Sequence, residues 1–416
     1  MRNFCQKIKP ISLSPNTERD DVWLAFKLIF QPWEWKKKGA VAELESQFKN
    51  YLGVKHAFSF NSGRSALMAI LVSLGLRQGD EVLVQTYTCN AAVNPILWTG
   101  LKPGYVDCNE NDFNIDTDDL EKKISSQSKV VMVQHTFGLP ADIDKVSEVA
   151  RQNNLILIED CAHSLGAEYR GKRVGSFGKA AFFSFGRDKV ISSVYGGIAV
   201  TNDDSLAKEI KKFQDEVEYS SCCWILQQLL HPILMNWIII PTYVFFGKYL
   251  LVLFQYLGIM SKAVHKKEKR GERPSYFPKK MPGALAGLAL NQLKKLERFN
   301  SHRREIAKLY SEGLKNTPYH LPLVFPERKN IFLRFTLKNE KAHEIIKKAW
   351  RKNIIIGDWY TVPIAPFDTK PEKVGYRQGS CPKAEKLAKA TLNLPTHINI
   401  SMDAAQKIIN FLLKCR

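Results

Sequence analysis

The sequence predicts an α/β fold in which a mostly parallel sheet is covered by helices on both faces. Two observations predict it. Helical and strand-like segments alternate over residues 40–215, and the strand-like segments are short apolar runs, which is typical of strands buried on both faces. With 45% hydrophobic and 25% charged residues, the composition excludes disordered and coiled-coil classes. A length of 416 residues favours two domains over one core.

The elements of the large domain follow in a regular order. An amphipathic helix over 41–52 leads to a strand at 56–60, and the apolar spacing of 65–74 predicts a helix that Gly75 is placed to end. Another helix is expected from about Ala91. Further strands are expected at 81–87, 102–108, 129–135, 155–160, 180–186 and 196–202.

The C-terminal part predicts a smaller α+β domain. Residues 287–313 form a long amphipathic stretch without proline, which indicates one helix that connects a large domain (1–285) to a small one (286–416). Strands are expected at 330–337 and 353–360, on either side of a helix over 340–352. A last helix, 404–415, closes the chain.

Charge and cysteine content narrow the classes of partner. The 61 basic and 41 acidic residues give a net charge of +20, which favours anionic partners. The basic residues are scattered apart from 262–273 and no recognition motif accompanies them, so we expect no nucleic-acid partner. Eight cysteines without zinc spacing predict reduced thiols, a cytoplasmic location and no metal site. The N-terminal residues 1–16 lack the apolar run of a signal peptide, so secretion is not expected.

Residues 219–260 do not fit the α/β pattern. No charged residue occurs from 219 to 247 if His231 is neutral, and the apolar character resumes after Lys248. Pro232 and Pro241 are expected to interrupt any helix long enough to span a bilayer. The composition favours an interfacial or re-entrant membrane element; the alternative is a buried helical hairpin or dimer contact followed by a solvated basic loop. The basic cluster consists of Lys262, Lys266, Lys267, Lys269, Arg270 and Arg273.

Two local patterns place reactive side chains at strand ends. The apolar strand LILIED ends in Glu159 and Asp160, with His163 close behind, and parallel sheets bind ligands at the carboxyl ends of their strands. The segment AAFFSFGRDKV places Ser184 and Lys189 on the turn after another strand. Each pattern alone is weak, since strands often end in Asp and most lysines are surface residues.

The turn 61–65 between a strand and a helix is the third pattern. Small residues at a helix N-terminus leave backbone N–H groups free for an anion. Pyridoxal phosphate needs a phosphate cradle, an acid opposite its pyridine nitrogen and an amine that holds its aldehyde. Ser62, Gly63 and Arg64 can form the phosphate cradle. Asp160 can supply the acid and Lys189 the amine.

These segments resemble the DegT/DnrJ/EryC1/StrS family of pyridoxal phosphate-dependent sugar aminotransferases, which have the fold type I architecture. The resemblance covers nearly the whole chain except 219–280. It includes LESQFKNYLGVKHAFSFNSGRSAL, GLKPGYVDCNENDFNIDTDDLEKKI, VMVQHTFGLPADID, IEDCAHSLGAEYRGKRVGSFG and FFSFGRDKVISSVYGGIAVTND.

The resemblance implies a role for each of the residues singled out above. Lys189 would hold the cofactor as a Schiff base and shuttle protons, Asp160 would pair with the protonated pyridine nitrogen, and His163 would lie near the ring hydroxyl. The phosphate-binding positions would be Ser62, Gly63, Arg64 and Ser184.

The sequence departs from the family pattern at four places. The turn before the lysine usually has more bulk, and here it reads Gly186, Arg187 and Asp188. The family often stacks an aromatic side chain on the cofactor in the segment aligned with QTYTCNAAVN; here Cys89 stands at that place and Tyr87 two residues earlier, and both are expected at the cofactor. The Asn and Arg that commonly precede the long helix are replaced by 278–281, PKKM. The substrate motif, which often ends in His, reads WYTVPIAP, so that Trp359 and Tyr360 are the expected substrate contacts.

We therefore predict an aminotransferase that moves an amino group from glutamate to a keto sugar, which we expect to be nucleotide-linked, for polysaccharide or glycoconjugate synthesis. A homodimer is expected, with an anionic membrane surface as a partner of 219–273. One alternative is a dehydratase-like relative, but such relatives usually replace the lysine by His, and Lys189 is present. The other alternative, a catalytically silent regulatory or scaffold protein, is disfavoured by the joint retention of Lys189, Asp160 and Ser184.

Overall fold

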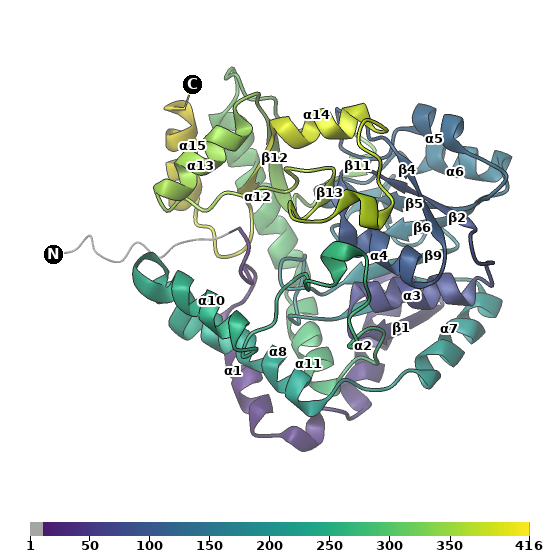
Figure 1. The fold of residues 1–416 in the computed structure, drawn as a ribbon. Coiled ribbons are helices and arrows are strands. Elements are labelled where there is room, and N and C mark those ends of the chain that lie inside the picture. Colours follow the sequence, from purple (N-terminus) through teal and green to yellow (C-terminus); the bar gives the residue numbers. More distant parts are fainter. Residues whose placement is uncertain (1–10, 416) are drawn as a thin grey trace.

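The computed structural model describes residues 11–415, so most of the N-terminal stretch used in the secretion argument lies outside the described residues. A seven-stranded sheet forms the centre of the molecule (Figure 1). Four of the six neighbouring strand pairs are parallel, which confirms the predicted mostly parallel sheet. The exception is β10, which runs antiparallel to both of its neighbours, β1 and β9. The strands lie in the order β1 (His56–Phe60), β10 (Gly197–Thr201), β9 (Ala180–Ser184), β6 (Ile156–Asp160), β5 (Ser128–Gln134), β2 (Glu81–Gln85) and β4 (Lys102–Val106).

Helices bury both faces of this sheet. Successive side chains of a strand point to opposite faces. On β9, Phe183 packs in the cluster that contains Phe48 and Leu285, whereas Phe182 packs in a different cluster with Leu67 and Ile96. The first cluster draws on α2 (Gly39–Leu52) and α11 (Gly283–Leu293), and the second on α3 (Gly63–Ser73) and α4 (Asn90–Trp98). Three more helices follow strands of this sheet in the chain: α5 (Thr117–Lys123), α6 (Ile143–Gln152) and α7 (Asp204–Glu216).

The C-terminal part packs around its own hydrophobic cluster, which includes Ile306, Phe335 and Ile409. Its sheet pairs β12 (Arg334–Lys338) with β14 (Thr391–Pro395), so the predicted strand at 353–360 is wrong. All five residues of β14 are buried and supply the partner that β12 needs, while Gly357 makes a single bridge to Asn393. Around this sheet lie α12 (Leu296–Gly313), α13 (Ala342–Arg351), α14 (Pro382–Ala390) and α15 (Met402–Leu413). The domain boundary at residue 285 stays a prediction.

The predicted single helix over 287–313 is two helices, α11 and α12. The break falls at Lys294 and Lys295, and at Lys295 the backbone reaches φ −100° and ψ 0°. The break lets the Lys295 ammonium reach the carboxylates of Asp20 and Asp21 on α1 (Arg19–Ile29), at 2.8 and 2.9 Å. Amphipathic periodicity alone does not reveal such a bend, because both helices keep an apolar side.

The apolar insertion is helical from Cys222 to Tyr256, and this 35-residue path is long and apolar enough to cross a membrane by length and composition. The expectation that prolines interrupt it is wrong, because both prolines lie inside helical turns. The path bends near Thr242 (φ −104°, ψ 6°), and a Cβ on Gly247 would lie 2.3 Å from the Ile239 carbonyl oxygen, so only glycine permits this close approach. The path comprises α8 (Cys222–Leu234), the π-helical Met235–Ile239, α9 (Ile240–Thr242), the π-helical Tyr243–Gly247 and α10 (Lys248–Tyr256).

Candidate active site

A cavity lies where β6 and β9 end and α3 begins. The carboxyl ends of neighbouring parallel strands meet at the same edge of a sheet, which brings segments far apart in the sequence to one place. Ten of the residues predicted from the sequence line this cavity: Ser62, Gly63, Arg64, Cys89, Asp160, His163, Ser184, Lys189, Trp359 and Tyr360.

Lys189 and Asp160 face the cavity from the ends of β9 and β6. Burial lowers the pKa of Lys189 below its ordinary value, while the neighbouring Cys89 and Asp160 oppose that shift. Burial raises the pKa of Asp160, whose Oδ1 accepts a hydrogen bond from the Ala162 N–H at 2.9 Å. A buried carboxylate with a raised pKa is stabilised by a cation placed against it. A protonated pyridine nitrogen would be such a cation, so the pair fits pyridoxal phosphate.

His163 lines the same cavity as a neutral ring. Burial, together with the charges of Lys189 and Arg334, lowers its pKa well below the ordinary value. Its Nδ1 accepts from the Phe137 N–H at 3.4 Å, which assigns the ring proton to Nε2 and leaves Nε2 a donor. The ring is stacked on Trp359 with the centroids 5.3 Å apart and the planes 17° from parallel.

The residues predicted to hold a phosphate lie on the first turn of α3 and at the end of β9. Ser62 caps the helix, since its Oγ accepts from the Ser65 N–H at 3.1 Å. A Cβ on Gly63 would lie 2.9 Å from the Ser184 Cβ, so glycine is needed for the two segments to approach. Gly197 on β10 is under the same constraint, because its Cβ would lie 2.3 Å from the Gly63 nitrogen. Backbone N–H groups at a helix start, beside a serine hydroxyl, fit a phosphate group.

The sequence did not predict that Arg64 would be paired with Glu268. The Glu268 side chain is fully buried, and it forms an ion pair with the Arg64 guanidinium, whose side chain is 12% exposed. Its second oxygen accepts from the His265 N–H at 2.8 Å. Burial lowers the pKa of Arg64, but the Glu268 charge outweighs that effect and raises it. The polybasic stretch contains two acids, Glu268 and Glu272, and nothing in the sequence indicates that Glu268 would be the buried one.

The segment 261–270 closes one side of the cavity. Arg187 donates to the Ser261 carbonyl and hydroxyl oxygens, both at 2.8 Å, and the Tyr195 hydroxyl donates to the Lys262 carbonyl at 2.6 Å. Ala263 and Val264 line the cavity. The apolar insertion is therefore attached to the cofactor site through the segment that follows it.

Tyr87 and Cys89, the two candidates for the stacking position, occupy different places. Cys89 lines the cavity, and burial raises the pKa of its thiol. Tyr87 does not line the cavity: its ring is fully buried between Phe113 and Tyr360, and its hydroxyl accepts from the Tyr360 N–H at 3.1 Å. Tyr87 thus holds the backbone that carries Trp359 and Tyr360.

Arg334 is a buried cation that the sequence placed only on a strand. It is 3% exposed, and its Cζ lies 3.3 Å from the centroid of the Trp359 ring. Within the described part of the chain, its Nη1 and Nη2 have no hydrogen-bond partner. Burial lowers its pKa to about 10, so the group is charged at neutral pH. A buried guanidinium with free donors is suited to an anion such as a carboxylate.

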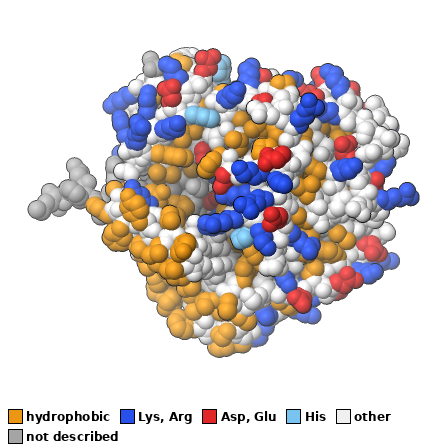
Figure 2. All heavy atoms as spheres, viewed as in Figure 1, with side chains coloured by type: hydrophobic (Ala, Val, Ile, Leu, Met, Phe, Trp, Pro, Cys, Tyr) orange, Lys and Arg blue, Asp and Glu red, His pale blue; other side chains and the backbone are white. Residues whose placement is uncertain are grey.

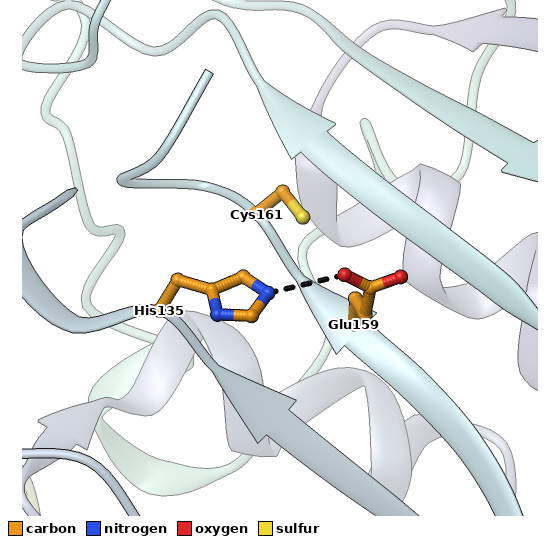
Figure 3. A group of neighbouring side chains, drawn as sticks. All are labelled: His135, Glu159 and Cys161. Carbon is orange, nitrogen blue, oxygen red and sulfur yellow. Dashed lines mark hydrogen bonds and ion pairs between the residues drawn. The ribbon is translucent and has the colours of Figure 1, made fainter. Parts of the chain in front are cut away.

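His135, Glu159 and Cys161 form a buried cluster (Figure 3), close enough together to share an ion, and Glu159 and Cys161 flank Asp160 in the sequence. Their arrangement is accounted for by hydrogen bonds. The His135 ring lies 3.2 Å from Glu159, and its Nδ1 accepts from the Ala141 N–H. Glu159 also accepts from three backbone N–H groups at 2.7–2.8 Å, those of Gly175, Phe177 and Gly178. The cluster fixes the end of β6 and thereby the position of Asp160.

Comparison with known proteins identifies relatives of this chain. The model of the DegT/DnrJ/EryC1/StrS aminotransferase family matches residues 25–222 and 248–413. A GDP-perosamine synthase of Escherichia coli O157:H7 is 28% identical over 89% of this chain and 88% of its own length. A GDP-perosamine synthase of Caulobacter vibrioides is 43% identical over 41% of this chain and 46% of its own.

Solved structures share the fold. The S. venezuelae DesV structure in complex with a ketimine intermediate has a TM-score of 0.75 at 24% identity and covers 95% of this chain and 94% of its own. A sugar aminotransferase from Streptococcus pneumoniae, in its PLP form, has a TM-score of 0.76 at 20% identity, with 98% and 97% covered. Since the family model matches both parts of the sequence, and a buried lysine faces an aspartate across the cavity, this chain belongs to the DegT/DnrJ/EryC1/StrS family and is a pyridoxal phosphate-dependent sugar aminotransferase.

Proposed function

We propose that this enzyme transfers an amino group from glutamate to a keto sugar carried on a nucleotide, for the synthesis of a polysaccharide or another glycoconjugate. The observation that carries the proposal is the pairing of Lys189 and Asp160 in one buried cavity. The named relatives that act on GDP- and dTDP-linked sugars support a nucleotide-linked substrate.

The protein's own groups divide the chemistry among them. The bound cofactor supplies the electron sink. Burial, which lowers the pKa of Lys189, favours the neutral amine that would accept and return a proton at the reacting carbon. Asp160 orients the ring through its nitrogen, and the Nε2–H of His163 is available to the ring hydroxyl. The segment 261–270 keeps water from one side of the site.

Arg334 supports a carboxylate-bearing amino donor such as glutamate. Its guanidinium packs on the Trp359 ring, which lines the cavity, while Arg334 itself lines a neighbouring hollow with Phe137 and Thr336; a carboxylate that reaches past Trp359 can accept from both unpaired nitrogens. In the proposed reaction Arg334 holds the donor while Lys189 moves the proton.

The assembly and location form part of the same proposal. By resemblance to the family, the enzyme is a homodimer with its sites near the subunit interface, for which light scattering should give twice 47.5 kDa. The location is the cytoplasm, at the cytoplasmic face of a membrane, supported by the run from 219 to 267 that contains no Asp or Glu.

A visible absorption spectrum with pyridoxal phosphate, before and after glutamate, tests the proposed function. The lysine-bound cofactor should give a band that glutamate removes and a keto sugar restores. Lys189→Ala should form no such band, whereas Lys348→Ala, an exposed lysine on α13, should behave like the wild type. A band that ignores every amino donor would refute the transaminase reaction.

A further inference from the structure

An unusually apolar surface lies on the side of the molecule formed by α1 and the insertion. Tyr256 is 85% exposed, and Trp23, Phe245 and Tyr249 are each at least 60% exposed. Figure 2 shows hydrophobic side chains along the left and lower left of the molecule, where Figure 1 places α10, α8 and α1. Soluble proteins rarely expose a large continuous apolar patch unless it binds something. We call the exposed hydrophobic side chains of α1 and of residues 237–257 the apolar face.

The two elements present one continuous surface. The Trp23 and Trp237 rings are 5.7 Å apart, and Phe26 lies 5.6 Å from Trp237. The opposite side of the insertion is already packed, since Ile225 and Leu229 enter the main core, and Met235, Ile239 and Met260 form a small cluster of their own. The exposed side chains are therefore additional to those that hold the insertion in place.

The insertion and the segment directly after it carry charges of one sign, whereas α1 also carries the exposed Asp20, which pairs with Lys295. The chain has no Asp or Glu from 219 to 267, and Lys248, Lys262, Lys266 and Lys267 are all exposed. Figure 2 shows Lys and Arg side chains gathered in the middle of the view, with a few Asp and Glu among them and hydrophobic side chains beside them. Aromatic and aliphatic side chains beside lysines complement the acyl and headgroup layers of an anionic bilayer.

We propose that the apolar face docks on an anionic lipid bilayer and lies in its interface. This inference deepens the membrane location of the proposed function and does not depend on the aminotransferase reaction. Residues 223–247 fall between the two ranges that match the family model, so the shared family scaffold does not account for them. The face ends at Leu257, four residues before Ser261, so docking places the bilayer next to the segment that closes the cavity.

Vesicle co-sedimentation of the full chain loaded with cofactor tests the inference, with vesicles of phosphatidylcholine alone or mixed with phosphatidylglycerol. The full chain should bind the mixed vesicles more tightly. Phe245→Ser/Phe246→Ser/Tyr249→Ser and, separately, Lys266→Glu/Lys267→Glu should each weaken binding at least about tenfold. Retained cofactor absorbance shows that the variants are folded.

Matched controls separate this surface from general stickiness. Val324→Ser/Phe367→Ser removes apolar side chains that are 86% and 76% exposed outside the face, and Lys347→Glu/Lys348→Glu reverses two exposed lysines on α13. Both controls should bind vesicles like the wild type. Equal losses in controls and test variants would overturn the inference. The inference would also be overturned if the wild type did not bind vesicles and the triple variant Phe245→Ser/Phe246→Ser/Tyr249→Ser differed from it in mass by light scattering. That result would assign the apolar face to contact between copies of this chain. Since neither readout uses a sugar, loss of transamination alone would refute only the proposed function.

Discussion

Replacing Glu268 by Gln removes the charge that neutralises Arg64 and keeps the shape of the side chain. The pair is buried, since the carboxylate is fully inaccessible and the Arg64 side chain is 12% exposed. Removing one partner of a buried ion pair costs about 3–5 kcal/mol. Gln still offers an acceptor oxygen, so the loss should approach the difference between a charged and a neutral hydrogen bond, about 1–2 kcal/mol.

The corresponding change in thermal stability is small but measurable. At about 2.1 cal/mol/K per residue, unfolding 416 residues carries an entropy of about 0.9 kcal/mol/K. The thermal unfolding midpoint of the cofactor-free protein should therefore fall by about 1–2 °C for Glu268→Gln and by about 3–6 °C for Glu268→Ala. Differential scanning fluorimetry without cofactor measures both. Glu272→Gln, an exposed position in the same segment, is the control and should not shift the midpoint.

In Glu268→Gln the affinity for pyridoxal phosphate should rise, although the thermal stability falls. Arg64 lines the cavity at the predicted phosphate cradle, and in the wild type its charge is neutralised by Glu268. In Glu268→Gln the free guanidinium should attract the phosphate dianion more strongly, and the dissociation constant of pyridoxal phosphate should fall severalfold. Fluorescence titration measures it. If Glu268→Gln lowered both the cofactor affinity and the thermal unfolding midpoint, this reasoning would be refuted. Such a result would mean that Glu268 positions Arg64 for the phosphate.

Two further predictions concern the buried cations of the site. The rate at which Lys189 captures the cofactor should rise with pH and reach a plateau. The midpoint of this rise should lie below pH 10.5, because burial lowers the pKa of Lys189 and only the neutral amine reacts. In Asp160→Asn, which removes a charge that opposes this shift, the midpoint in stopped-flow absorbance should move lower still; an unchanged midpoint would contradict the proximity of the two groups. Arg334→Leu should raise the KM for glutamate at least about tenfold while the KM for the sugar changes little, since an ion-paired hydrogen bond contributes about 1.5–3 kcal/mol. Steady-state kinetics with each substrate varied in turn decides this, and equal effects on both KM values would exclude a donor-specific role.

Local sequence patterns determined most of the large domain and much of its site. Apolar runs and helical spacing depend on neighbours along the chain, so the strands that end at Asp160 and Ser184, and the turn at Gly63, could be predicted before any contact was known. The same reasoning failed at 353–360, an apolar run that lies beside β14 without joining the sheet as a strand. It also failed at Lys295, where contacts with α1 accompany a break in a periodic segment.

The tertiary structure alone decided which distant side chains meet. Glu268 reaches Arg64 across 204 positions of sequence, and Arg334 at the start of β12 stacks on Trp359, which lies in a turn. The apolar face is also a tertiary feature, because Trp23 and Trp237 share a surface only when α1 lies beside α8. Charge pairing and burial are properties of neighbours in space, whereas the sequence records neighbours along the chain. The amino acids therefore determined the elements and the cofactor chemistry, and packing determined what surrounds them.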